Sequence, residues 1–458
     1  MVERELTLIK RPERPLEREA DLALHASAER DFLRAIGLAQ SNLRDLRETT
    51  GSLIHILRFQ GQTDIDATPL RKTIQDYILR MHPYDQQSYG THALARVEIE
   101  LGNIPAANVA LEATGENDII SHLRLDFARG YAKAGIDPQP MLNVVKETAG
   151  RVRIKRNPDV FEISTGKQIG DVTALAVTHF QLGLDPTPFL TQTRELLGSS
   201  QSSEKDYHVG QLAKAYALCG DFTNALALVD TIIARDPKAT KKRRMETRYA
   251  IAKEQLKLGD IEGALNTAVR SKDNTLMGEI NARVAIYKAE GGEDPTEEID
   301  RTLSRMVNIK SAWSQGLLYS MLGRAKALAK EDPKGMFVMA MEKALSLEVS
   351  EDPMADLFER FTEDVDASGF DATPVFKIAL EWADRALEEK LPSYDIGTPD
   401  MYQGMATEAI IHQQIKLGYL EMAEQTLSRM ENDPSVDIFY IDLLAELAHA
   451  KAIKAAAA

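Results

Sequence analysis

The sequence predicts an all-α protein, a right-handed α-α superhelix (solenoid) of about ten helical hairpins, and three observations support this class. Apolar or small residues recur at three- and four-residue spacing, the period of a helix. Aromatic residues make up only 6% of the chain, which suits close packing of helix on helix. An apolar–small pair stands eight and seven positions before a glycine at six places, and such self-similarity indicates stacked hairpins. The six pairs begin at Leu94, Phe127, Leu175, Leu212, Ile251 and Val284.

Nine glycines mark the predicted turns between the two helices of each hairpin. They are Gly61, Gly102, Gly135, Gly183, Gly220, Gly259, Gly292, Gly369 and Gly418. Their successive intervals are 41, 33, 48, 37, 39, 33, 77 and 49 residues. The 77-residue interval halves at Glu331-Asp332-Pro333, a turn without a glycine. About ten hairpins are therefore predicted.

Two signals predict where the second helix of a hairpin begins. Four turns have an alanine five residues after the glycine, where a small side chain lets two helices approach: Ala107, Ala225, Ala264 and Ala423. Four others carry Asp-Pro, at Asp137, Asp185, Asp294 and Asp332. The aspartate can accept hydrogen bonds from free N–H groups, and proline fits the first helical position. These residues mark helix starts and need no chemical role.

The remaining segments complete the predicted organisation. Residues 1–16 are charged and predict a flexible tail, and residues 17–50 predict a long or broken capping helix. The repeat array then covers 51–434, and 435–458 predict a C-terminal capping helix. Within the array, 151–164 alternates apolar and polar residues around Asn157-Pro158, which predicts a small β-hairpin insertion.

Composition excludes several classes of function. A single cysteine, Cys219, rules out an intramolecular disulfide framework and fits a reducing compartment. The first residues are too charged for a signal peptide, and no apolar stretch approaches the length of a membrane span. The sequence therefore predicts a cytoplasmic protein with no membrane association. The net charge of -15 makes nucleic acid an unlikely partner.

Motifs for catalysis, cofactors and metals are missing from the sequence. The nine histidines are scattered without an HExxH pair, and one cysteine cannot form a zinc knuckle. The phosphate-binding and nucleophile-elbow glycine motifs are also absent. Paired carboxylates such as Glu351-Asp352 are expected by chance among 70 acidic residues. We therefore expect no enzyme activity, no cofactor and no metal.

One segment resembles a known repeat family. In Gln211–Pro237, Leu212-Ala213 matches the large–small pair of the tetratricopeptide repeat, and Tyr216 matches its aromatic position. Gly220-Asp221-Phe222 matches its turn. Ala225 and the final Asp236-Pro237 also fit, and the resemblance extends more weakly over about 52–434. The interval lengths drift beyond the near-constant period of that family, so a related helical-hairpin solenoid is an alternative. The resemblance implies that a groove lined by first helices binds peptides or protein surfaces.

A column of basic residues stands six positions before the turn glycine. Six of its nine members are basic or histidine: His55, Arg96, Arg129, Lys214, Lys253 and His412. In the tetratricopeptide pattern this column faces the groove, where cations would favour acidic segments or a C-terminal carboxylate. The alternative is a solvated helix face, since cations near a helix C-terminus also complement its dipole. Arg153, Lys155 and Arg156 on the predicted β-hairpin form a second candidate contact.

The sequence thus predicts a non-enzymatic scaffold or adaptor whose groove binds a protein or peptide, possibly an acidic one. The alternatives are a ligand- or peptide-responsive regulatory sensor and a structural subunit of a larger complex. The candidate binding residues are Arg96, Arg129, Lys214, Lys253, His412, Arg153, Lys155 and Arg156. The sequence carries no signal for the oligomeric state.

Overall fold

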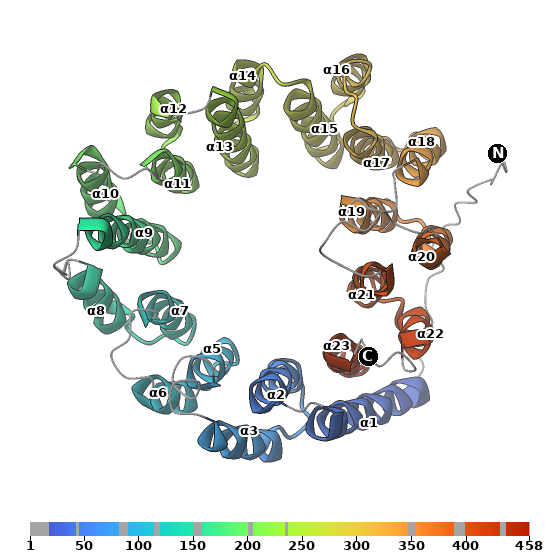
Figure 1. Ribbon diagram of the computed structural model, residues 1–458. Coiled ribbons are helices and arrows are strands. Elements are labelled where there is room, and N and C mark those ends of the chain that lie inside the picture. Colours follow the sequence, from blue (N-terminus) through green and yellow to red (C-terminus); the bar gives the residue numbers. More distant parts are fainter. Residues whose placement is uncertain are drawn as a thin grey trace. The chain divides into compact units, whose positions relative to one another are not determined.

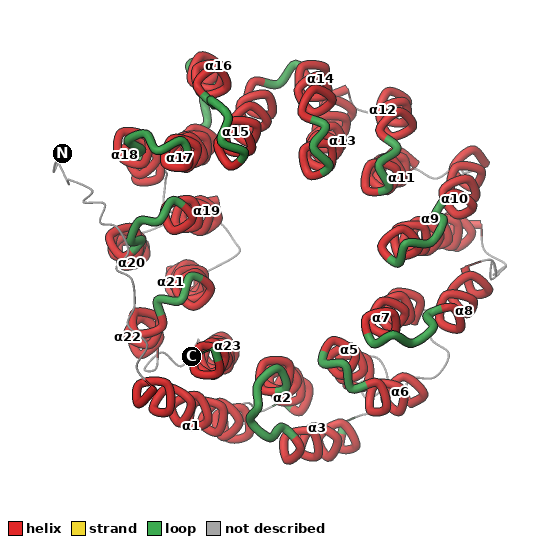
Figure 2. Tube along the Cα trace, turned by 180° about the vertical axis from the view of Figure 1, so that it is seen from behind, coloured by secondary structure: helices red, strands yellow, loops and turns green. Residues whose placement is uncertain are grey.

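The fold is all-α. The computed structural model describes ten segments, in which 22 helices and no strand occur (Figure 2). The described residues are 18–42, 45–81, 90–113, 120–149, 158–199, 205–233, 237–346, 353–388, 399–430 and 437–457. They divide into two compact units, which we call the mixed unit (1–97 with 285–458) and the central unit (98–284).

Helical hairpins build both units. The helices of the central unit are α6 (Ile104–Ala113), α7 (Ile120–Lys133), α8 (Gln139–Ala149), α9 (Pro158–Gln181), α10 (Thr187–Ser199), α11 (Lys205–Leu218), α12 (Phe222–Thr231), α13 (Pro237–Lys257) and α14 (Ile261–Ser271). Two helices, α5 (His92–Glu100) and α15 (Asn274–Glu290), cross the boundary between the units.

The mixed unit combines the beginning and the end of the chain. Its helices are α1 (Arg18–Asn42), α2 (Leu46–Gln60), α3 (Thr68–Arg80), α16 (Thr296–Met306), α17 (Ala312–Leu328), α18 (Lys334–Leu345), α19 (Pro353–Ala367), α20 (Thr373–Glu388), α21 (Pro399–Lys416), α22 (Leu420–Met430) and α23 (Asp437–Ala456).

Each unit has two layers of helices. The first helix of a hairpin packs on its own second helix and on the first helix of the next hairpin. In the central unit α7, α9, α11 and α13 therefore lie side by side, and α8, α10, α12 and α14 form the other layer (Figure 1). In the mixed unit α17, α19, α21 and α23 form such a layer, which α2 continues by packing on α23. The predicted apolar–small pairs are buried between these layers.

The first helices end as the glycine pattern predicts. Eight of the nine turn glycines have φ between 71° and 79°, the left-handed conformation that glycine adopts without a steric cost. The exception is Gly61, with φ −67°. In the left-handed turns the next N–H reaches the carbonyl five residues back, as from Asn103 to Glu98 at 2.9 Å. This arrangement satisfies carbonyls at the helix end.

The turn without a glycine uses a lysine instead. Lys330 has φ 62°, and the N–H of Glu331 bonds the carbonyl of Lys326 at 2.8 Å, as in the glycine turns. Lys330 therefore takes the glycine's place, immediately before the predicted position. On the same hairpin a Cβ at Gly323 would lie 2.5 Å from the ring of Phe337, so α17 and α18 approach too closely for a side chain there.

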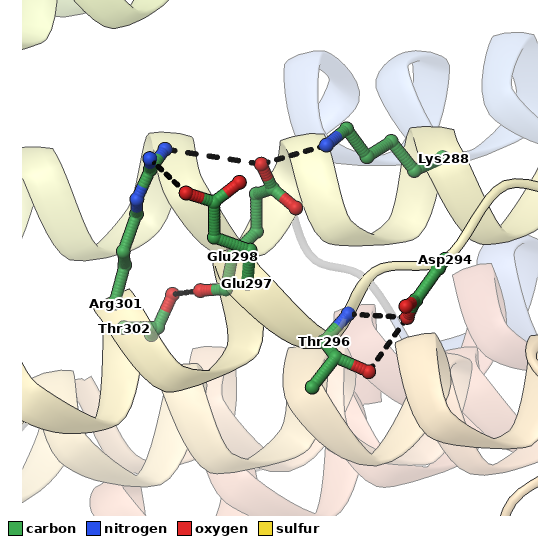
Figure 3. A network of polar contacts seen from close by, with 7 residues as sticks. All are labelled: Lys288, Asp294, Thr296, Glu297, Glu298, Arg301 and Thr302. Atoms are coloured by element: carbon green, nitrogen blue, oxygen red, sulfur yellow. Dashed lines mark hydrogen bonds and ion pairs between the residues drawn. The ribbon is translucent and has the colours of Figure 1, made fainter.

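The Asp-Pro signal also marks helix starts. In all four turns the aspartate Oδ1 accepts the N–H two residues later at 2.9–3.0 Å. At Asp294 the Thr296 hydroxyl adds a second bond at 2.6 Å (Figure 3). These bonds from Thr296 lower the pKa of Asp294. The four alanines after the other glycines are all fully buried, as close hairpin packing requires.

The predicted β-hairpin at 151–164 is wrong in the part that the structure describes. Residues 158–164, its second strand, form the first turns of α9. Pro158 stands at the first position of that helix, where its missing N–H costs no bond. Seven residues of alternating apolar and polar character are too few to distinguish the two-residue period of a strand from the 3.6-residue period of a helix. Arg153, Lys155 and Arg156 lie outside the described residues.

The two chain ends pack on each other. Helix α1 lies along α23 and also contacts α2 (Figure 1). Lys451 of α23 is 2% exposed, and its Nζ donates to Asp31 Oδ2 at 2.8 Å and to Ser27 Oγ at 3.1 Å, both on α1. The same Nζ lies 3.3 Å from Glu424 Oε1 on α22. A buried ion pair thus joins residues that are more than 400 positions apart.

Candidate functional site

In the central unit the basic column lies on the layer of first helices. Arg129 on α7 reaches the next first helix, where it donates to Thr178 Oγ1 at 3.0 Å, and it also pairs with Asp126. Lys214 and Lys253 are half-buried at the same position on α11 and α13. The Nζ of Lys253 lies 5.4 Å from the centre of the Tyr249 ring. These cations therefore lie at the surface of one layer, and Arg129 is held by a neighbouring helix.

In the mixed unit two cations of the column, Arg324 and His412, pair with carboxylates. Arg96 on α5 is exposed. Arg324 lies six positions before Lys330, so it belongs to the column, although the missing glycine hid it from the sequence pattern. It bonds Glu290 Oε1 at 2.9 Å and lies 3.6 Å from Asp364 Oδ1 on the next first helix. A turn pattern that admits lysine at the left-handed position would have found Arg324.

The same pairing continues on α19 and α21. The column member on α19 is Glu363, and Lys416 of α21 pairs with it and lies 3.7 Å from Glu359. The hydrogen bond from Lys416 to Glu363 raises the pKa of Lys416. Ion pairs thus link first helices of this unit sideways, and Arg324 and Lys416 both have carboxylate partners from the chain itself.

His412 lies between two carboxylates. Its Nδ1 pairs with Glu446 of α23, and its Nε2 lies 3.7 Å from Glu408, one turn earlier on α21. Hydrogen bonds to Glu408 and Glu446 raise the pKa of His412 to about 10. The side chain is therefore an imidazolium at neutral pH, with both nitrogens directed at carboxylates.

Burial raises the pKa of two aspartates on the first-helix layer of this unit. For Asp442 on α23, burial and the neighbouring charge of Glu408 raise the pKa to about 7, against the effect of His412. For Asp364 on α19, burial raises the pKa to about 6, although Ser320 donates a hydrogen bond at 2.7 Å. Both groups titrate close to neutral pH, where an ordinary aspartate is fully ionised.

A pocket of about 770 Å³ opens beside His412. Its walls come from α2, α19, α21, α22 and α23, and they combine apolar side chains with a few polar ones. The apolar wall includes Phe59, Ile415 and Ile453, and the polar wall includes Gln413 and His449. A pocket of this size matches the range for small ligands or a short stretch of peptide.

Both chain ends contribute to the lining of the pocket. Phe59 of α2 lies near the N-terminus, and its ring centre is 5.4 Å from that of His449 on α23. His55 packs edge-on against Phe59 at 4.9 Å, and burial lowers its pKa. Three histidines that are scattered in the sequence, counting His412, are thus brought to one region. The basic column had placed His55 and His412 at the same position of first helices, but sequence spacing gave no sign that His449 joins them.

Other polar groups have structural roles. On α16 the 2%-exposed Glu298 accepts a hydrogen bond from Lys288 of α15 at 2.8 Å, which ties the hairpin together, and Arg301 lies beside it (Figure 3). Burial raises the pKa of the Cys219 thiol to about 11, which disfavours a nucleophilic role. In the segments that the structure describes, no group of His, Cys, Asp or Glu side chains could hold a metal ion.

No helix in the described part of the chain combines the length and the apolar character needed to cross a bilayer.

Comparisons with known proteins leave the family open. No family model matches the chain, and no curated protein matches its sequence. A solved structure described as a "Circular tandem repeat protein with novel repeat topology and enhanced subunit contact surfaces" is 12% identical and covers 96% of this chain and 99% of its own. Its TM-score is 0.16, which is too low to carry an argument. The repeat character of this chain rests on its own stacked hairpins and recurring turns.

Proposed function

We propose that this chain is a non-enzymatic scaffold or adaptor that binds a protein or peptide on its layers of first helices. The observation that carries the proposal is a cation at the same position of three first helices of the central unit, Arg129 on α7, Lys214 on α11 and Lys253 on α13. Helix α9, which lies between α7 and α11, has Val177 at this position. Side-by-side helices offer an extended surface, and a repeated cation along it favours acidic segments of a partner. The finer expectations of tetratricopeptide-like hairpins, a right-handed superhelix and a cytoplasmic location belong to the same proposal.

Charge reversal tests this surface. We would capture partners from the native lysate with the parent protein and with the triple variant Arg129→Glu, Lys214→Glu, Lys253→Glu. A matched control reverses three exposed cations on second helices of the same unit: Lys146, Arg194 and Arg270. The proposal expects the first variant to lose a partner that the control retains, at unchanged helicity by circular dichroism. Equal capture by both variants would refute it.

A ligand-responsive sensor is the second candidate, and the pocket beside His412 favours it. Helices from both chain ends line this pocket, so a bound molecule could alter how α2 and α23 pack. Small-angle scattering of the protein with and without captured ligand separates the two functions. A sensor changes its radius of gyration on binding, whereas a scaffold keeps it.

A further inference from the structure

The last and the first helix of the chain pack on each other as the two helices of a hairpin do, although no turn joins them. Toward the end of α23, Lys451 donates to Ser27 and Asp31 of α1. Near the start of α23, Tyr440 packs against Arg34, which lies further along α1 and has its guanidinium carbon 5.8 Å from the centre of the tyrosine ring. Positions that advance along one helix thus recede along the other, so the two helices are antiparallel.

The buried face of α1 suits such a hairpin. Ala28, Phe32, Ala35 and Ala39 are each at most 1% exposed. Their spacing of four, three and four residues places them on one side of the helix. The alanines among them allow the close approach that the buried alanines after the turn glycines allow in other hairpins. Helix α1 therefore takes the place of a second helix, and α23 takes the place of its first helix.

This contact joins two distant segments of the chain. The mixed unit consists of 1–97 and 285–458, and the central unit lies between them in the sequence. In the described part of the mixed unit, α1 and α2 of the first segment pack on α23 of the second. We call the contact of α23 with α1 and α2 the clasp. Its two sides are connected along the chain only through α3 to α22, so non-covalent contacts hold the clasp closed.

Polar groups are buried in the clasp. Lys451 is 2% exposed and donates to Asp31. The ring of His449 packs on Phe59 of α2, and its Nδ1 is buried with no hydrogen-bond partner among the described residues. Opening returns these groups to water, and their hydration offsets part of the apolar contact that is lost. Opening at the clasp therefore costs less than unfolding the hairpins on either side, because unfolding would also break their helices and turns.

From this geometry we propose that the clasp opens with the neighbouring hairpins intact, and that its open surfaces bind the matching surfaces of a second copy of this chain. The occupant follows from identity, because every copy carries the same α1, α2 and α23. An exchanged clasp repeats each contact of the closed one, including the bond from Lys451 to Asp31. Two exchanged clasps join two chains in a dimer. This inference does not depend on the cation surface proposed for the central unit.

Complementary charge reversals test the exchange. Asp31→Lys sets two ammonium groups against each other within one chain, and Lys451→Glu sets two carboxylates against each other. In a dimer with one chain of each variant, one clasp has the original ion pair and the other has the reversed pair. Both clasps are then satisfied, whereas a single variant, alone or with its own copy, has like charges in every clasp. The mixture therefore favours the dimer.

Mass and amide exchange report the outcome in the full-length protein. We expect size exclusion with light scattering to give the equimolar mixture twice the mass of either variant alone. In each variant alone, α1 and α23 should exchange about 150-fold faster than in the parent protein or faster still, and mixing should restore their protection. The double variant Asp31→Lys with Lys451→Glu re-forms the pair within one chain, so it should keep the mass of a single variant and the protection of the parent.

Two control variants reverse an exposed ion pair outside the clasp. Asp384 of α20 and Arg429 of α22 lie 3.4 Å apart, and both side chains are at least half exposed. Asp384→Lys and Arg429→Glu should change neither the mass nor the exchange of α1, alone or mixed. A dimer in this control mixture would show that charge reversal alone promotes association, and it would overturn the proposal.

Three further results would also refute the exchange. The first is a mixture of the clasp variants with the mass of the single variants. The second is a single variant that forms the larger species as readily as the mixture does. The third is a double variant that opens like the single ones, because the ion pair would then not determine the clasp. If a single variant failed to fold alone, the two would be co-expressed with different tags, and the proposal then requires that they co-purify.

Discussion

The buried ion pair between the chain ends allows a sharp prediction. Lys451→Met removes the ammonium group but keeps most of the stem, and it leaves Asp31 without its partner at 2.8 Å. Breaking a buried pair typically costs about 3–5 kcal/mol. Asp31 keeps 15% of its side chain exposed and Glu424 keeps 59%, so both recover some hydration. We therefore expect a loss of about 3 kcal/mol, at the lower end of that range.

Hydrogen exchange is the suitable assay for this variant. Repeat proteins need not unfold in a single step, so one global free energy would not report on the chain ends. Helix α1 packs on α23 and α2, so the loss should appear as faster exchange in α1 and α23. A difference of 3 kcal/mol corresponds to about a 150-fold faster opening of these helices. The helices of the central unit should exchange at the parent rate.

A second variant controls for the lost packing. Lys451→Met with Asp31→Leu removes both charges, and apolar replacement of a whole buried pair is often neutral or stabilising. We expect the double variant to recover most of the protection of α1. If Lys451→Met exchanged like the parent protein, or if the double variant were worse than the single one, the reasoning about this ion pair would be refuted.

Three further predictions concern single residues. Lys330→Gly should raise the free energy of unfolding by about 0.5–1 kcal/mol, and Gly220→Ala should lower it by about 1 kcal/mol, because both sites have left-handed φ. Thermal and urea unfolding measure both changes. If the two variants changed the free energy of unfolding in the same direction, the assignment of these turns would be contradicted. The pKa of Asp442 is raised to about 7, so the folded state binds more protons than the unfolded state between about pH 4 and pH 7. Stability should therefore fall as pH rises through this window, and Asp442→Asn should flatten the profile and add on the order of 1 kcal/mol at pH 8. Cys219 is half-buried and has a pKa of about 11, so it should react with iodoacetamide at pH 8 about 100-fold more slowly in the folded than in the unfolded protein. Equal rates in mass spectrometry would contradict the raised pKa.

The turns were predictable because their signal is local. A glycine at φ near 75° and an aspartate that accepts the N–H two residues on act within a few residues of each other. The same local signals predicted the tenth turn at Glu331-Asp332-Pro333, within three residues of Lys330. They failed at residues 158–164, because seven alternating residues fit a strand and a helix equally well until Pro158 begins α9.

The candidate site was only partly predictable. The basic column identified His412 and located the first helices, but it could not tell which cations already have carboxylate partners. Those partners come from the next first helix, as Glu363 does for Lys416, or from a distant one, as Glu446 does for His412. The pocket-lining residues Gln413 and His449 had no signal in the sequence, because the pocket forms only where their helices α21 and α23 meet.

The sequence by itself determined the helical class, the turn positions and the repeated column, since each follows from backbone preferences over short stretches. The tertiary structure alone decided that α1 packs on α23, that Lys451 meets Asp31, and that a pocket opens beside His412. The physical reason is distance along the chain. Helix packing and charge pairing depend on which surfaces meet, and the meeting of surfaces from opposite chain ends is a property of the tertiary structure.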